Sequence, residues 1–163
     1  YLFWGSGFQP IKVRELSRDW TAFAENTTSK SLIYPREEEA YSNLIEGAWV
    51  DFFNGFYYLY YSGDNCCGLN ANYAVMVARS KNLTGPYSTM AKVKGIKSSV
   101  VLAKNDNWLA PGHNSIFEDK NGQRWMAYHA IPATELASQT QKRVMCISRL
   151  SYKNGWPEIE IDK

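Results

Sequence analysis

Apolar and polar residues alternate along most of the chain with the two-residue period of β-strands, and helical periodicity is nearly absent. One aromatic strand recurs three times, at residues 1–6 (YLFWGS), 58–63 (YLYYSG) and 125–130 (WMAYHA). The turn sequences Asn54-Gly55 and Asn121-Gly122 precede the second and third copies. Because Asn-Gly is the preferred centre of a two-residue hairpin turn, the pattern predicts an all-β fold built from a repeated hairpin.

Further strand-like segments follow each copy, so that the second and third copies belong to units of four strands. The expected strands are 1–6, 11–16 and 21–23 in the first unit, 49–53, 56–62, 72–80 and 86–88 in the second, and 115–118, 123–130, 142–150 and 156–161 in the third. Four antiparallel strands repeated in this way are typical of β-propeller blades, whereas a β-sandwich is the alternative architecture. The matching aromatic strand in every unit favours the propeller.

The hairpin turns also predict which residues lie opposite one another. A two-residue turn at Asn54-Gly55 sets Glu46 across from Gly63, and one at Asn121-Gly122 sets His113 across from Ala130. Equivalent positions of successive blades converge at one mouth of the central channel. The residues that we expect at that mouth are Glu46, His113, Ser6 and the loop 64–67.

Composition narrows the classes of function. The formal net charge of the 163 residues is +2, and no run of like charges indicates binding to nucleic acid or to an anionic membrane. No segment has the roughly 20 apolar residues of a membrane span. The three cysteines match no zinc motif. The adjacent pair Cys66-Cys67 forms either a vicinal disulfide that stiffens its loop or two free thiols.

Two side chains at the expected channel mouth carry candidate chemistry. Glu46 stands among the apolar or small residues Ile45, Gly47, Ala48 and Trp49, an environment that favours a protonated carboxyl and suits a general acid. The alternative is a solvated charge at the end of a strand. His113 follows the small-residue turn Pro111-Gly112, and its alternative role is structural.

Several ordered motifs resemble glycoside hydrolase family 43, and within it the arabinan endo-1,5-α-L-arabinanase-like enzymes. The motifs are Glu46-Gly47-Ala48-Trp49, residues 57–63, Asn65-Cys66-Cys67-Gly68, residues 110–115, Tyr128-His129-Ala130, Arg143-Val144-Met145 and Gly155-Trp156-Pro157. The resemblance implies that residues 1–163 are part of a five-bladed β-propeller. Residues 1–30 would be the end of blade 3, residues 46–90 blade 4, and residues 113–161 blade 5.

The resemblance also implies an activity, which is hydrolysis of arabinan or a xylan-type plant polysaccharide with inversion. By its motif Glu46 matches the general acid, whereas the base aspartate and the aspartate that tunes the acid would both precede Tyr1. The chain is therefore expected to be a fragment that is inactive by itself. A non-catalytic carbohydrate-binding or scaffold propeller is the alternative function.

Further expectations follow from the same resemblance. The cleft residues would be Ser6, Asn65, Cys66 and Arg143, and His113 would hold calcium or another cation in the channel through water, with no organic cofactor. The partner would be an oligosaccharide or polysaccharide, with no nucleic acid and no membrane. We further expect a secreted protein that self-associates through exposed blade edges.

Overall fold

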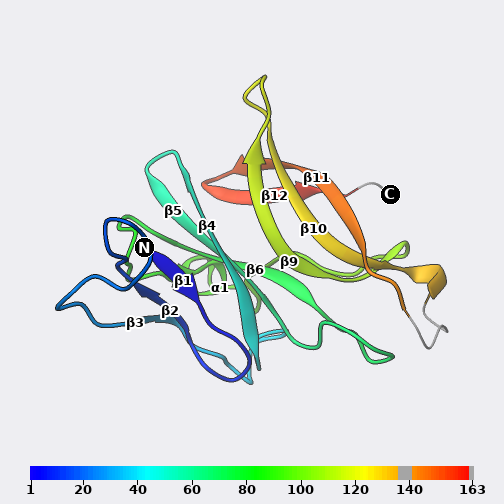
Figure 1. Cartoon of the computed structure of the whole chain (residues 1–163). Coiled ribbons are helices and arrows are strands. Elements are labelled where there is room, and N and C mark those ends of the chain that lie inside the picture. The colour runs from blue at the N-terminus through cyan, green and yellow to red at the C-terminus, as the bar shows by residue number, and fades with distance from the viewer. Residues whose placement is uncertain (136–140, 162–163) are drawn as a thin grey trace.

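The computed structural model describes residues 1–135 and 141–161, which form three antiparallel sheets. The first sheet has the order β1 (Leu2–Trp4), β2 (Ile11–Arg14), β3 (Lys30–Ile33). The second has the order β4 (Ile45–Phe53), β5 (Phe56–Gly63), β6 (Ala74–Ser80), β7 (Ser88–Thr89), and β8 (Val100–Leu102) also pairs with β6. The third has the order β12 (Trp156–Glu160), β11 (Val144–Lys153), β10 (Arg124–Pro132), β9 (Trp108–Glu118). Figure 1 shows the second sheet between the other two.

Strand β5 is buried on both faces because it lies in the middle sheet. Tyr58 and Tyr60 pack into one apolar cluster with residues of β10, β11 and β12. Leu59 and Tyr61, which point to the opposite face, pack into a second cluster with Ile11 and other residues of the first sheet. The aromatic strand found in the sequence is therefore a core element that joins all three sheets.

The hairpin predicted between β4 and β5 is confirmed. Phe53 pairs with Phe56, and the intervening Asn54 and Gly55 have φ angles of 46° and 78°. Positive φ at both central residues is the requirement of a type I′ turn, which Asn and Gly meet at low cost. The predicted pairing holds from this turn as far as Trp49, which lies opposite Tyr60.

Beyond Trp49 the prediction is one residue wrong, because a β-bulge interrupts β4. The register shifts between Glu46 and Trp49, so Glu46 lies opposite Ser62 and not opposite Gly63. A bulge places two residues of one strand against one residue of its partner. Gly47, with a φ of 60°, lies within the bulge.

The predicted pairing of β9 with β10 is also wrong. Glu118 pairs with Arg124, so five residues rather than two make the turn. The Asp119 carboxylate accepts hydrogen bonds from the backbone N–H groups of Asn121 and Gln123, at 2.8 and 3.0 Å, and holds this wider turn. Together with later register shifts, it brings His129, not Ala130, close to His113, since His129 pairs with Gly112.

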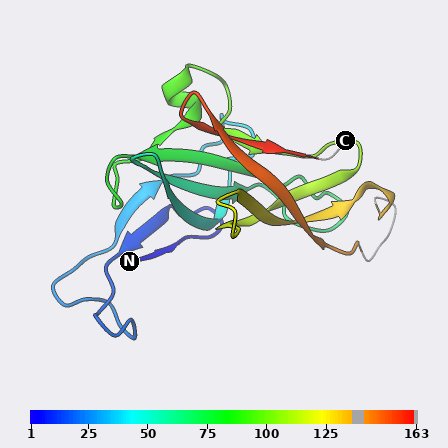
Figure 2. The same ribbon diagram turned by 90° about the horizontal axis from the view of Figure 1, so that it is seen from above.

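The third strand of the first sheet is β3, and the segment 21–23 that was expected to supply it is not a strand. Phe23 makes only an isolated bridge to Leu16. The Asp19 carboxylate instead accepts hydrogen bonds from the hydroxyl groups of Ser17 and Thr21, which stabilises a local turn. The whole connection from β2 to β3 extends away from the sheets (Figure 2).

Few residues are helical. The helix α1 (Met90–Lys94) and the 3₁₀ turn η1 (Ala133–Glu135) are the helices of the described chain. Among the described residues, no helix has the length and apolar character to cross a membrane.

A polar network links the second sheet to the third. Asp51 on β4 forms an ion pair with Arg124 on β10 and accepts a hydrogen bond from the Tyr152 hydroxyl at 3.1 Å. The Tyr152 hydroxyl also lies 3.0 Å from that of Tyr60. Since the network joins β4, β5, β10 and β11, it helps to hold the second and third sheets in their relative orientation.

Candidate active site

Glu46 lies at the start of β4, where the bulge ends the regular pairing of that strand with β5. Its side chain is half-buried. One carboxylate oxygen, Oε1, accepts a hydrogen bond from the Tyr73 hydroxyl at 2.7 Å. The other, Oε2, lies 3.5 Å from the hydroxyl of Ser6, an exposed residue that follows β1. The structure thus brings Glu46 and Ser6 together, as the sequence predicted.

His113 lies on β9 beside Glu46's neighbour Gly47. A Cβ atom at Gly47 would stand 3.3 Å from the His113 ring, so glycine allows β4 and β9 to approach closely at this point. The backbone N–H of His113 donates to the Ser62 hydroxyl at 2.8 Å. His113 has a φ of 53°, a conformation that is uncommon outside glycine and turns its exposed side chain away from the regular strand direction.

His129 and Arg143 complete the surroundings of Glu46. The His129 ring lies parallel to that of Tyr73, with 5.7 Å between centroids. Burial, helped by the positive charge of Arg143, lowers the pKa of His129 to about 4. Its Nδ1 atom is buried and has no hydrogen-bond partner in the described part of the chain. His129 is therefore neutral near pH 7.

Arg143 itself is exposed and precedes β11. Its charge lowers the pKa of His129 and opposes the rise in the pKa of Tyr73. The predicted cleft residue thus lies near enough to act electrostatically on the buried Tyr73 and the partly buried His129.

The predicted cleft residues of the β5–β6 loop, Asn65 and Cys66, make contacts within the loop and with neighbouring strands. Cys66 and Cys67 form the vicinal disulfide that the sequence left open. Cys66 packs against the small apolar cluster of Tyr73, Ala110 and Ile131. The Asn65 amide donates to the Asn70 carbonyl at 3.0 Å, so it stabilises the loop.

Tyr73 is the main residue that sequence reasoning missed. It immediately precedes β6, and the register of β5 with β6 ends with Gly63 opposite Ala74. Extending that register by one residue would have placed Tyr73 beside the end of β5, next to the predicted position of Glu46. Ser62, which accepts from the His113 backbone, was likewise contained in the aromatic strand and not recognised.

The described residues do not fit a calcium site formed by direct protein ligands. No group of three or more His, Cys, Asp or Glu side chains in residues 1–135 and 141–161 has the arrangement of a metal site. Calcium prefers six to eight oxygen ligands, and the predicted contact, His113, offers an imidazole nitrogen.

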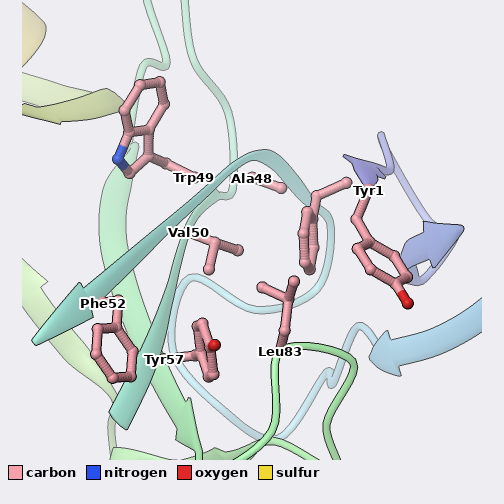
Figure 3. A pocket seen from close by; sticks show the side chains of 8 residues that line it. Tyr1, Ala48, Trp49, Val50, Phe52, Tyr57 and Leu83 are labelled. Carbon is pink, nitrogen blue, oxygen red and sulfur yellow. The ribbon is translucent and has the colours of Figure 1, made fainter. Parts of the chain in front are cut away.

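A separate apolar cavity of about 420 Å³ lies between β1 and β4 (Figure 3). Its lining includes Tyr1, Val50, Tyr57 and Leu83, and Glu46 is not part of it. Figure 3 shows the Trp49 ring on the opposite side of β4 from Val50. The cavity is distinct from the candidate active site, because Glu46 does not line it.

Comparison with known proteins assigns the family. The sequence profile of Glycosyl hydrolases family 43 matches residues 1–157. The chain belongs to this family. The resemblance read from the motifs around Glu46 and His113 is thereby confirmed.

Relatives of this family 43 chain are arabinan-degrading enzymes by name. It is 28% identical to the probable arabinan endo-1,5-alpha-L-arabinosidase A of Aspergillus flavus over 98% of its own length and 51% of the relative's. It is 30% identical to the extracellular endo-alpha-(1->5)-L-arabinanase 1 of Bacillus subtilis, over 96% of its length and 46% of the relative's.

The fold agrees with that of a solved relative. The Cellvibrio cellulosa alpha-L-arabinanase superposes with a TM-score of 0.80 at 27% identity, covering 97% of this chain and 52% of the other. Its complex with arabinohexaose superposes with a TM-score of 0.78 at 26% identity, with the same coverage. The chain spans about half the length of the relatives it matches, and its three sheets are part of a five-bladed β-propeller.

Proposed function

We propose that this chain supplies the general acid of a secreted enzyme that hydrolyses arabinan. The observation that carries the proposal is the state of Glu46, whose carboxyl is held by a buried tyrosine while its second oxygen lies beside the exposed Ser6. Family membership and relatives named as arabinanases support the reaction and the substrate, and the Bacillus subtilis relative, named as extracellular, supports secretion.

In the proposed reaction Glu46 protonates the glycosidic oxygen as the bond from that oxygen to the anomeric carbon breaks. A water molecule attacks the anomeric carbon from the opposite side, which gives inversion. A second carboxylate accepts the proton of that water. By the motifs of the family, the base and the aspartate that tunes the acid would both precede Tyr1. We therefore propose that both come from outside this chain, which spans about half the length of its relatives.

The proposal is tested on the gene product that contains this chain, with linear arabinan and xylan as substrates and reducing ends as the readout. Glu46→Gln keeps the shape of the side chain and removes its acidity, so we expect kcat on arabinan to fall by about 10²–10⁴-fold. Glu118→Gln, a change at an exposed residue on β9, is the matched control. Full activity of the Glu46→Gln protein would overturn the assignment.

The 163-residue chain is tested alongside the full product. We expect negligible turnover of arabinan, because no base would activate water. Turnover that Glu46→Gln abolishes would show that the chain needs no outside carboxylate. Binding of arabino-oligosaccharides by the full product without any hydrolysis would favour a carbohydrate-binding propeller instead.

A further inference from the structure

The two oxygens of the Glu46 carboxyl have different surroundings. Oε1 accepts a 2.7 Å hydrogen bond from the hydroxyl of Tyr73, a residue that is only 1% exposed. Oε2 has one longer contact among the residues that the structure describes, 3.5 Å from the hydroxyl of the exposed Ser6. The first oxygen is therefore held from the interior of the protein, whereas the second lies toward the exposed Ser6.

Tyr73 has little freedom to move away from Glu46. One face of its ring lies parallel to the His129 ring, at an angle of 5°. A Cβ atom at Gly112 would stand 2.1 Å from the Tyr73 ring, a distance that no real contact allows. Gly112 is thus required for Tyr73 to occupy this position, and Ala110 and Ile131 complete its apolar surroundings.

The Tyr73 hydroxyl remains a donor throughout the ordinary pH range. Burial, followed by the neighbouring carboxylate of Glu46, raises the pKa of Tyr73. The other charged or titratable groups of the site are His113 on β9, the neutral His129 on β10 and Arg143 before β11. Because Tyr73 keeps its proton, its hydroxyl is able to donate to Oε1 of Glu46, as it does in this structure.

We infer that Tyr73 is a positioning residue that holds Oε1 and thereby makes Oε2 the oxygen that delivers the catalytic proton. This inference rests on the proposed role of Glu46 as the general acid. The proton passes from Oε2 to the glycosidic oxygen, which keeps the electron pair of the breaking bond. Water supplies the hydroxyl group of the new sugar end, and the base carboxylate takes the proton of that water. The Glu46 carboxylate that results is stabilised by the hydrogen bond from Tyr73.

A spectroscopic test applies to the chain itself and needs no turnover. With ¹³C-labelled glutamate, the carboxyl-carbon signal of Glu46 is assigned from its loss in Glu46→Gln. We expect Tyr73→Phe, which removes only the hydroxyl, to shift this signal at pH 7. The control is Tyr87→Phe, because Tyr87 is also buried but donates to the Leu83 carbonyl. An unchanged Glu46 signal in Tyr73→Phe would overturn the inference.

A kinetic test uses the gene product that contains this chain. Misplacing a catalytic group costs up to about 10²-fold, so we expect Tyr73→Phe to lower kcat on arabinan by about 10–100-fold with little change in KM. The loss should shrink on an aryl arabinofuranoside with a good leaving group, because such a bond needs little protonation. A purely structural role predicts an equal loss on both substrates, together with a lower melting temperature.

The outcomes separate the two proposals. If Glu46→Gln is inactive and Tyr73→Phe is fully active, the role of Tyr73 is wrong and that of Glu46 stands. If Glu46→Gln retains full activity, the general-acid assignment fails, whatever Tyr73→Phe does. Gly112→Ala provides a second variant, since its new methyl group displaces the Tyr73 ring, and it should reproduce the shift of the Glu46 carbon signal.

Discussion

Stability should fall as the pH drops below neutrality because the protein must keep His129 neutral. The folded chain lowers the pKa of His129 from the ordinary 6.5 to about 4, chiefly through burial and secondarily through Arg143. Between these two values the unfolded chain binds a proton that the folded chain does not. The free energy of unfolding is therefore not reduced by His129 above pH 6.5, and it falls through protonation of the unfolded chain as the pH drops toward 4.

The difference between the two pKa values is equivalent to roughly 3 kcal/mol at most. His129 is only partly buried, and solvent screens its interaction with the exposed Arg143, so we expect about 1–2 kcal/mol. The assay is urea unfolding of the chain and of His129→Gln at a series of pH values from 7.5 to 4. The free energy of unfolding should fall more steeply for the unmodified chain.

Comparing the two proteins removes the contribution of carboxylates, which titrate in both. His113→Gln provides the matched control, since this second histidine of the chain is exposed, and its curve should keep the steep fall. Parallel curves for the unmodified chain and His129→Gln would refute the reasoning, because they would mean that His129 takes up its proton equally well in both states.

Two further predictions concern the sheets. Asp51→Asn should lower the free energy of unfolding by about 2–4 kcal/mol in urea titrations, because it leaves the largely buried Arg124 with only its longer pair to the exposed Glu118. Glu118→Gln, which weakens only the exposed 3.6 Å pair with Arg124, should cost less than about 1 kcal/mol, and equal losses would contradict the role of burial. The edge of β1 and the exposed aromatic side chains of Tyr1 and Phe52 should cause self-association, so light scattering should show dimers or larger species and a monomer would speak against it.

Much of the fold could be predicted because the turn residues and the two-residue alternation of apolar and polar side chains indicate the same strands. The Asn54-Gly55 turn has one low-energy solution, and it set the register of β4 and β5 as far as Trp49. The Asn121-Gly122 pair looked equivalent, yet the preceding Asp119 binds two backbone N–H groups and opens the turn to five residues. A side chain that competes for backbone donors is not visible in an alternation of apolar and polar residues.

The candidate site was predicted only in part, for a related reason. Glu46 and His113 were found because each opens an expected strand with unusual neighbours. Tyr73 carries no such signal, since an aromatic residue beside a strand is normally core. Its role depends on a hydrogen bond across the sheet and on the space left by Gly112, and both follow from tertiary packing. The resemblance to the family pointed to Glu46 as the proposed acid, and the structure added the hydrogen bond from Tyr73 to its carboxyl.

The bulge in β4 separates the register of Glu46 from the register that the Asn54-Gly55 turn sets along the rest of the strand. Between the bulge and the turn, pairing follows the register set at Asn54-Gly55. On the other side of the bulge, Glu46 pairs with Ser62 and accepts a hydrogen bond from Tyr73. Changes that adjust the outer strands of this sheet need not rotate the carboxyl out of place. Conversely, substitutions around Gly47 should change the direction of Glu46 while the pairing between Trp49 and the turn is retained.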